Sequence, residues 1–141
     1  MAGETLTVLV FSDDSNTRDQ VRLALGPRPA ADLPSVEYVE CATEWAVLDR
    51  LAKGDVDLAI LDGEAVPAGG IGVCRTIKQE VFAAPPILVL LGRPQDSWLA
   101  SWARADAVVH QPLDPIATAS QAAELLRARV APASTTVVPH A

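Results

Sequence analysis

Residues 56–61 of the chain read Val-Asp-Leu-Ala-Ile-Leu, and Asp62 follows them at once. A short run that is almost continuously apolar is typical of a strand covered on both faces, as in a parallel sheet. Two further runs, residues 6–11 and 87–91, have the same character. Together these three runs predict the buried centre of a parallel sheet.

Two other runs, residues 36–41 and 107–110, complete a set of five expected strands, and a helical pattern follows each strand. The apolar positions at helical spacing are, in chain order, Val21, Ala24 and Leu25; Trp45, Leu48 and Leu51; Val73, Ile77 and Val81; Trp98, Leu99 and Trp102; and Ile116, Ala119, Ala123, Leu126 and Val130. This alternation predicts an α/β fold, a doubly wound (βα)₅ parallel sheet with helices on both faces.

Polar and cyclic residues mark where the helices begin. Ser15 or Asn16 is expected to cap the first helix, because both side chains can accept a hydrogen bond from a free backbone N–H. The pair Asp114-Pro115 is expected to open the fifth helix with a cap and a proline at the first helical position. Trp45 is expected to pack the second helix onto the sheet.

The chain has 141 residues, which is the size of one domain. We assign residues 1–130 to this domain. Residues 131–141 turn to Ala, Pro, Ser, Thr and Val without periodicity, and we interpret them as a flexible C-terminal tail.

The charge and hydropathy of the chain exclude several classes of partner. Acidic residues number 18 and basic residues 11, so the net charge is −7. This charge argues against nucleic acid or an anionic membrane as a partner. The sequence has no apolar stretch of about 20 residues for a membrane span. Its acidic N-terminus does not fit a signal peptide, so we expect a cytoplasmic protein.

Cys41 and Cys74 are the two cysteines, and they lie far apart in apolar patterns. We interpret them as buried thiols in a reducing compartment, in preference to a disulfide or a metal site. The two histidines, His110 and His140, give little support for zinc.

Acidic residues follow two of the expected central strands. Ligands of open parallel sheets bind beyond the carboxyl ends of the strands, where the strand order reverses. In the order 2-1-3-4-5 this point brings Asp13 and Asp14 toward Asp62. At about 5 Å and an effective dielectric of about 20, each pair of carboxylates would repel by roughly 3 kcal/mol. Mg²⁺ would relieve this repulsion, although single aspartates after strands are also common caps and turn formers.

The chain resembles the receiver domains of bacterial two-component response regulators. The resemblance rests on residues 8–14 (VLVFSDD), 57–62 (DLAILD), 70–75 (GIGVCR), 86–91 (PILVLL) and 105–113 (ADAVVHQPL), and it covers nearly all of residues 5–130. It implies a flavodoxin-like fold with Asp62 as the phosphoacceptor. It also implies that Asp13, Asp14 and Asp62 bind Mg²⁺ together with the backbone carbonyl of Glu64.

The chain departs from the receiver pattern at the positions that usually form the switch. Leu91 stands where receivers have Thr or Ser, Gln111 where they have Lys, and Val108 where they have an aromatic residue; Val66 replaces a proline. Without the Lys, no charge neutralises the incoming phosphoryl group. Leu91 cannot hydrogen-bond that group, so the contacts that would distinguish two states are missing.

Two other residues are candidates to replace these groups. Arg93 could supply a cation, although a solvated loop arginine is the more ordinary reading of its position. His110 should point to the face opposite Gln111, because side chains alternate along a strand, and we discount it.

Trp98 and Trp102 stand one helical turn apart. Core packing is the favoured interpretation. The alternative is an aromatic patch for binding a partner or a second copy of the chain.

We therefore predict a stand-alone, atypical receiver without enzymatic activity, acting through protein–protein contacts with a histidine kinase, a phosphotransfer protein or an effector protein. A conventional switch driven by phosphorylation of Asp62, or a phosphorelay intermediate, is the alternative. A flavin-binding or enzymatic flavodoxin-like protein is a weaker one, because the acidic loop around Asp13 would repel a flavin phosphate.

Overall fold

The computed structural model describes residues 5–66 and 68–130, so the tail assigned to residues 131–141 lies outside the described part. Strands and helices alternate along the chain. The strands are β1 (Thr5–Phe11), β2 (Ser35–Cys41), β3 (Leu58–Asp62), β4 (Ile87–Leu91) and β5 (Ala107–His110). The helices are α1 (Ser15–Leu25), α2 (Glu44–Leu51), α3 (Gly70–Glu80), the short 3₁₀ turn η1 (Pro94–Asp96), α4 (Ser97–Trp102) and α5 (Pro115–Val130).

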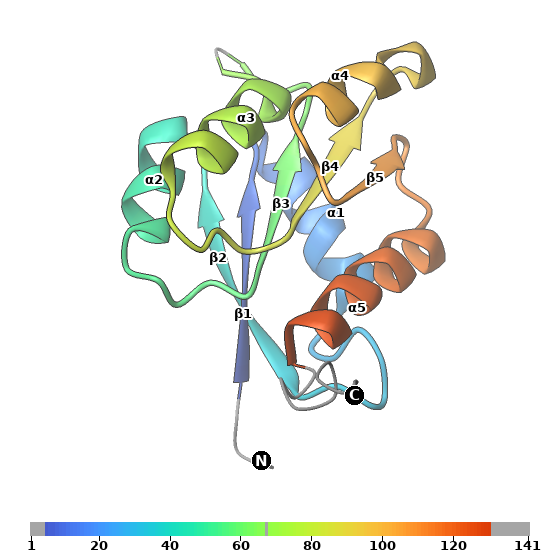
Figure 1. Cartoon of the computed structure of the whole chain (residues 1–141). Helices are drawn as coiled ribbons and strands as arrows, with labels where there is room; N and C mark the ends of the chain where they lie inside the picture. The colour runs from blue at the N-terminus through green and yellow to red at the C-terminus, as the bar shows by residue number, and fades with distance from the viewer. Residues whose placement is uncertain (1–4, 67, 131–141) are drawn as a thin grey trace, which may run out of the picture.

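All five strands form one parallel sheet in the order β2-β1-β3-β4-β5 (Figure 1). This order and the flavodoxin-like (βα)₅ architecture confirm the prediction from the sequence. The order reverses between β1 and β3, so the ends of these two strands lie side by side. The predicted site therefore falls at the reversal point of the sheet.

The sheet separates two hydrophobic cores. One core joins alternate strand residues such as Leu61 and Leu91 to α2, α3 and α4, and the other joins residues such as Ile60 to α1 and α5 (Figure 1). Every residue of β3 and β4 is buried, and apart from Asp62 their successive side chains enter opposite cores. This double burial is the reason that these strands are continuously apolar in the sequence.

The ends of several elements differ from the prediction. Strands β1 and β2 each begin one residue earlier than predicted, at Thr5 and Ser35. Strand β3 begins at Leu58 and includes Asp62, whereas the sequence suggested residues 56–61. Helix α1 begins at Ser15, but its N-cap is Asp14, whose carboxylate accepts a hydrogen bond from the Asn16 N–H at 2.9 Å. The expectation of Ser15 or Asn16 as the cap was therefore wrong by one residue. The start of α5 at Pro115 is as predicted.

In α2 and α5, Leu51, Ala123 and Leu126 are buried as predicted, but one large residue of each expected stripe lies outside. Trp45 of α2 is 75% exposed and Ile116 of α5 is 81% exposed. The buried residues of these helices include Val47 and Thr118, each two positions later. Two residues turn the helix by about 200°, so Trp45 and Ile116 lie on the outer side. Val130, the last residue of α5, is also exposed.

The same geometry places the two tryptophans of α4 outside. Ala100 is the buried residue of this helix, and Trp98 and Trp102 lie two positions before and after it. They are 66% and 50% exposed. Core packing of these tryptophans was therefore the wrong interpretation. Both side chains lie at the surface, and their use for binding a partner or a second copy of the chain stays a prediction.

None of the helices within residues 5–66 and 68–130 is long and apolar enough to cross a membrane.

Cys41 and Cys74 are both free and buried, as predicted. Burial raises the pKa of the Cys74 thiol to about 11, because it disfavours the charged thiolate.

We expect Cys74 in the folded protein to resist alkylation by iodoacetamide at pH 8 and to react once the protein is unfolded in urea, because the thiolate is the reactive form. Mass spectrometry of the cysteine peptides measures the extent of alkylation. Rapid alkylation of Cys74 under native conditions would contradict its burial.

The raised pKa of Cys74 also makes stability depend on pH. Ionisation of the thiol is easier in the unfolded state, so the free energy of unfolding should fall as the pH rises from about 9 to about 11.

Candidate functional site

Asp62 is the last residue of β3 and lies between β1 and β4 at the carboxyl edge of the sheet. Only 4% of its surface is exposed. The start of α3 packs closely behind it: a Cβ atom on Gly70 would lie 2.6 Å from the Asp62 carbonyl oxygen. Glycine at the start of α3 therefore allows the helix to approach the strand end and hold Asp62 in place.

Three donors hold the Asp62 carboxylate. The Ser12 hydroxyl donates to Oδ2 at 2.7 Å, and the backbone N–H of Glu64 donates to Oδ1 at 2.8 Å. The side-chain amide of Gln111 donates to the same Oδ1 at 3.1 Å. All three donors are neutral, and none of the ion pairs found among the described residues involves Asp62.

Ser12 is fully buried, and its surroundings fix its position. Its backbone N–H donates to the carbonyl of Cys41 on β2 at 3.1 Å, and its carbonyl accepts from the Arg18 guanidinium at 2.5 Å. Its hydroxyl also accepts from the backbone N–H of Asp14 at 3.0 Å. Ser12 was not among the site residues predicted from the sequence, where its only signal was its place directly after the first expected strand.

The carboxylates of the two acidic residues after β1 accept hydrogen bonds from backbone N–H groups elsewhere. The Asp13 carboxylate accepts from the backbone N–H of Val66 at 3.1 Å and so links the first loop to the loop after β3. The Asp14 carboxylate caps α1. An N-cap of this kind contributes about 1 kcal/mol, which would be lost if Asp14 rotated toward Asp62.

The expected convergence of three carboxylates is not found. Within residues 5–66 and 68–130, no group of three or more His, Cys, Asp or Glu side chains could hold a metal ion. The donor set of Asp13, Asp14 and Asp62 has the chemistry that Mg²⁺ prefers, but its arrangement does not fit. Glu64 contributes its N–H to Asp62, and its own carboxylate accepts from the Gly92 N–H at 3.2 Å.

Of the three positions that depart from the receiver pattern, Gln111 belongs to this network, Leu91 bonds to Gln111, and Val108 lies in β5. Leu91 is fully buried at the end of β4, and Val108 is partly buried in β5. The backbone N–H of Gln111 donates to the Leu91 carbonyl at 2.8 Å, which places the Gln111 side chain within reach of Asp62.

The two substitute candidates do not reach Asp62. Arg93 is exposed and pairs with Asp96 at 3.0 Å, as expected for a solvated loop arginine. His110 is exposed, and its ring lies 3.5 Å from the Ser97 hydroxyl of α4. The prediction that His110 points away from the site is confirmed.

A surface patch on α4 is the second candidate site. It consists of Trp98, Trp102 and Arg75 of α3. The Arg75 guanidinium lies 3.9 Å from the centre of the Trp102 ring and donates to the Trp102 carbonyl at 3.0 Å. This cation–π contact holds one tryptophan in a fixed orientation at the surface.

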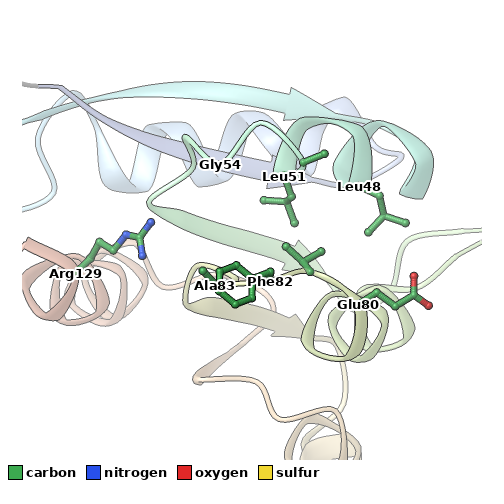
Figure 2. A pocket seen from close by; sticks show the side chains of 9 residues that line it. Leu48, Leu51, Gly54, Glu80, Phe82, Ala83 and Arg129 are labelled. Carbon is green, nitrogen blue, oxygen red and sulfur yellow. The ribbon is translucent and has the colours of Figure 1, made fainter.

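A pocket of about 620 Å³ lies near the amino ends of the strands, opposite to the edge that holds Asp62. It is surrounded by the carboxyl ends of α2, α3 and α5. Figure 2 shows its side chains, among them Leu48, Leu51, Phe82 and Arg129. Neither Asp62 nor the α4 patch lines this pocket, so it belongs to neither candidate site.

Comparisons with solved structures identify the fold as that of receiver domains. The chemotaxis response regulator CheY4 of Vibrio cholerae matches with a TM-score of 0.72 and 19% identity, over 87% of this chain and all of the other. A two-component response regulator from Clostridium difficile matches with a TM-score of 0.73 and 15% identity, over 89% of this chain and 99% of the other.

The sequence comparison shows the family. A response regulatory protein of Mycobacterium tuberculosis strain H37Rv is 52% identical over 123 residues, which are 87% of this chain and 92% of that protein. A response regulatory protein of the CDC 1551 strain matches with the same identity and coverage. No family model matches the chain. The chain belongs to the response regulators, and it is a receiver domain of two-component signalling.

We expect Ser12→Ala to lower the free energy of unfolding by about 2 kcal/mol, because it removes a buried hydrogen bond to a charged acceptor. Urea denaturation of the full chain measures the change. Ser101→Ala, on the exposed side of α4, is the matched control and should change stability by less than about 0.5 kcal/mol. Equal effects of the two substitutions would show that the Ser12–Asp62 bond does not stabilise the fold.

Proposed function

We propose that this receiver acts through a protein–protein contact that does not depend on phosphorylation. Asp62 is the residue in the position to accept a phosphoryl group, but its modification does not control the contact. The observation that carries the proposal is the direct hydrogen bond from Gln111 to Asp62, at the position where a receiver would have a cation.

A switch requires contacts that differ between two states. Leu91 offers no hydrogen-bond donor at the end of β4, and its side chain is already packed in the core with Leu61. Val108 has no ring that could move between an inward and an outward position. A phosphoryl group on Asp62 would therefore find no hydroxyl at the end of β4 and no aromatic ring on β5 to draw toward it.

The charge balance at Asp62 also argues against fast phosphorylation. Phosphoryl transfer is accelerated by cations that stabilise charge on the transferring oxygens. Ser12 and Gln111 supply neutral hydrogen bonds in their place. Arg18, the cation that bonds to Ser12, is occupied by the Ser12 carbonyl and by Glu40 at 2.9 Å.

The α4 patch is the surface that fits a protein partner. Tryptophan and arginine are the residues that most often dominate binding energy at protein interfaces. Trp98 and Trp102 lie one turn apart on the outer side of α4, so they present one continuous aromatic surface. Histidine kinases, phosphotransfer proteins and effector proteins are the classes of partner that a receiver meets.

The first test exposes the full chain to acetyl phosphate with Mg²⁺ and records intact mass and the indole N–H signals of the three tryptophans. We expect the Trp98 and Trp102 signals to remain unshifted whether or not an adduct forms, because the site has no moving contact to α4. Asp62→Asn is the control for the adduct. An Asp62-dependent adduct that shifts these two signals would contradict the proposal.

The second test compares binding of a partner identified by cross-linking of the wild-type chain. Asp62→Asn should change its affinity by less than about twofold, because the contact does not use the phosphoacceptor. Trp98→Ala should weaken binding at least about tenfold, as expected for truncation of a central aromatic side chain. Trp45→Ala, an exposed tryptophan on α2, is the matched control. Loss of binding with Asp62→Asn alone would favour a conventional switch.

A conventional switch or phosphorelay role remains the second candidate. It is favoured by the position of Asp62 at the carboxyl end of β3, where the Glu64 N–H already stabilises an oxyanion.

A further inference from the structure

The three donors on Asp62 leave little room for a metal ion. A carboxylate offers about four lone-pair sites, and three of them accept hydrogen bonds from Ser12, Glu64 and Gln111. We infer that this receiver holds Asp62 in a metal-independent state and that the Ser12 hydroxyl is the group that excludes Mg²⁺. The inference rests on the proposed function, because both assign Asp62 a fixed hydrogen-bonded role.

The orientation of the donors opposes a cation. The hydroxyl, backbone and amide hydrogens all point at the carboxylate oxygens, so their positive ends occupy the space that a cation would need. Mg²⁺ demands an octahedral set of oxygen ligands at about 2.0–2.1 Å. It would therefore have to compete with three donors for the carboxylate oxygens of Asp62, where only one lone-pair site is left.

The two other carboxylates of the expected metal site are already hydrogen-bonded. Asp13 accepts from the Val66 N–H, and Asp14 accepts from the Asn16 N–H as the cap of α1. These two hydrogen bonds would compete with Mg²⁺ for the Asp13 and Asp14 carboxylates, as the three on Asp62 would for that side chain. No group of three acidic or other ligand side chains is already assembled in the described part of the chain to offset this competition.

Ser12 is the residue on which the exclusion depends most directly. Ser12 is fully buried and directly follows β1, and its hydroxyl oxygen lies 2.7 Å from Asp62 Oδ2. A carboxylate in its place would remove the donor and put a second negative charge beside Asp62. Two adjacent carboxylates repel, and a divalent cation relieves the repulsion.

The test is a Mn²⁺ titration of the full-length chain, followed by paramagnetic broadening of the Glu64 amide and Gln111 side-chain amide signals and competed with Mg²⁺. The proteins are the wild type, Ser12→Asp, and Ser101→Asp as a control with the same change in net charge. We expect no saturable, Mg²⁺-competed broadening at these signals in the wild type or in Ser101→Asp. Ser12→Asp should bind at least tenfold more tightly, with broadening at both signals.

Several outcomes would overturn the inference. Saturable binding in the wild type that competes with Mg²⁺ and is lost in Asp62→Asn would show that the hydrogen bonds do not exclude the metal. A folded Ser12→Asp protein that binds no better than Ser101→Asp would overturn the assignment to Ser12. If circular dichroism shows that Ser12→Asp is unfolded, the comparison of wild type with Asp62→Asn decides the question.

The outcome is distinguishable from a failure of the proposed function. Metal binding by the wild type with unshifted Trp98 and Trp102 signals would overturn only the metal-independent state. Shifted tryptophan signals without metal binding would overturn only the phosphorylation-independent output.

Discussion

The Asp62 carboxylate ends the central strand of a buried sheet, and its charge has to be stabilised by the protein because little water reaches it. A buried carboxylate without donors would be costly. Three separate segments meet this requirement: the end of β1 through Ser12, the loop after β3 through Glu64, and the end of β5 through Gln111. The same bonds tie the three segments together, so the charge of Asp62 organises the whole carboxyl edge of the sheet.

The network also separates this chain from the mechanism that its fold suggests. A receiver can switch only if phosphorylation creates contacts that the resting state lacks. Here Gln111 already contacts Asp62, and Leu91 is already packed in the core. On the function proposed above, the edge keeps a single state, and the signal is carried by a surface that is exposed in that state. The α4 patch, with Trp102 held by Arg75, is such a surface.

In α2, α4 and α5 the tryptophans and isoleucine that the sequence suggested as inward residues lie outside. Each is two positions away from a buried residue, which is about half a helical turn. Small residues such as Ala100 and Thr118 face the sheet instead. The parallel strands are close-packed and apolar, so small side chains allow the helices to lie near them, and large aromatic residues remain outside.

The sequence by itself determined the strand pattern, the order of elements and the position of Asp62, because continuous apolar runs and helical spacing are local signals that burial imposes directly. It also identified Leu91, Val108 and Gln111 as departures from the receiver pattern. Only the tertiary structure decided that Ser12 and Gln111 both bond to Asp62, that Asp13 and Asp14 turn away, and that Trp98 and Trp102 are exposed. The contacts of Ser12, Gln111 and Asp13 join residues about 50 positions apart, and side-chain direction at such distances is set by packing and not by local sequence.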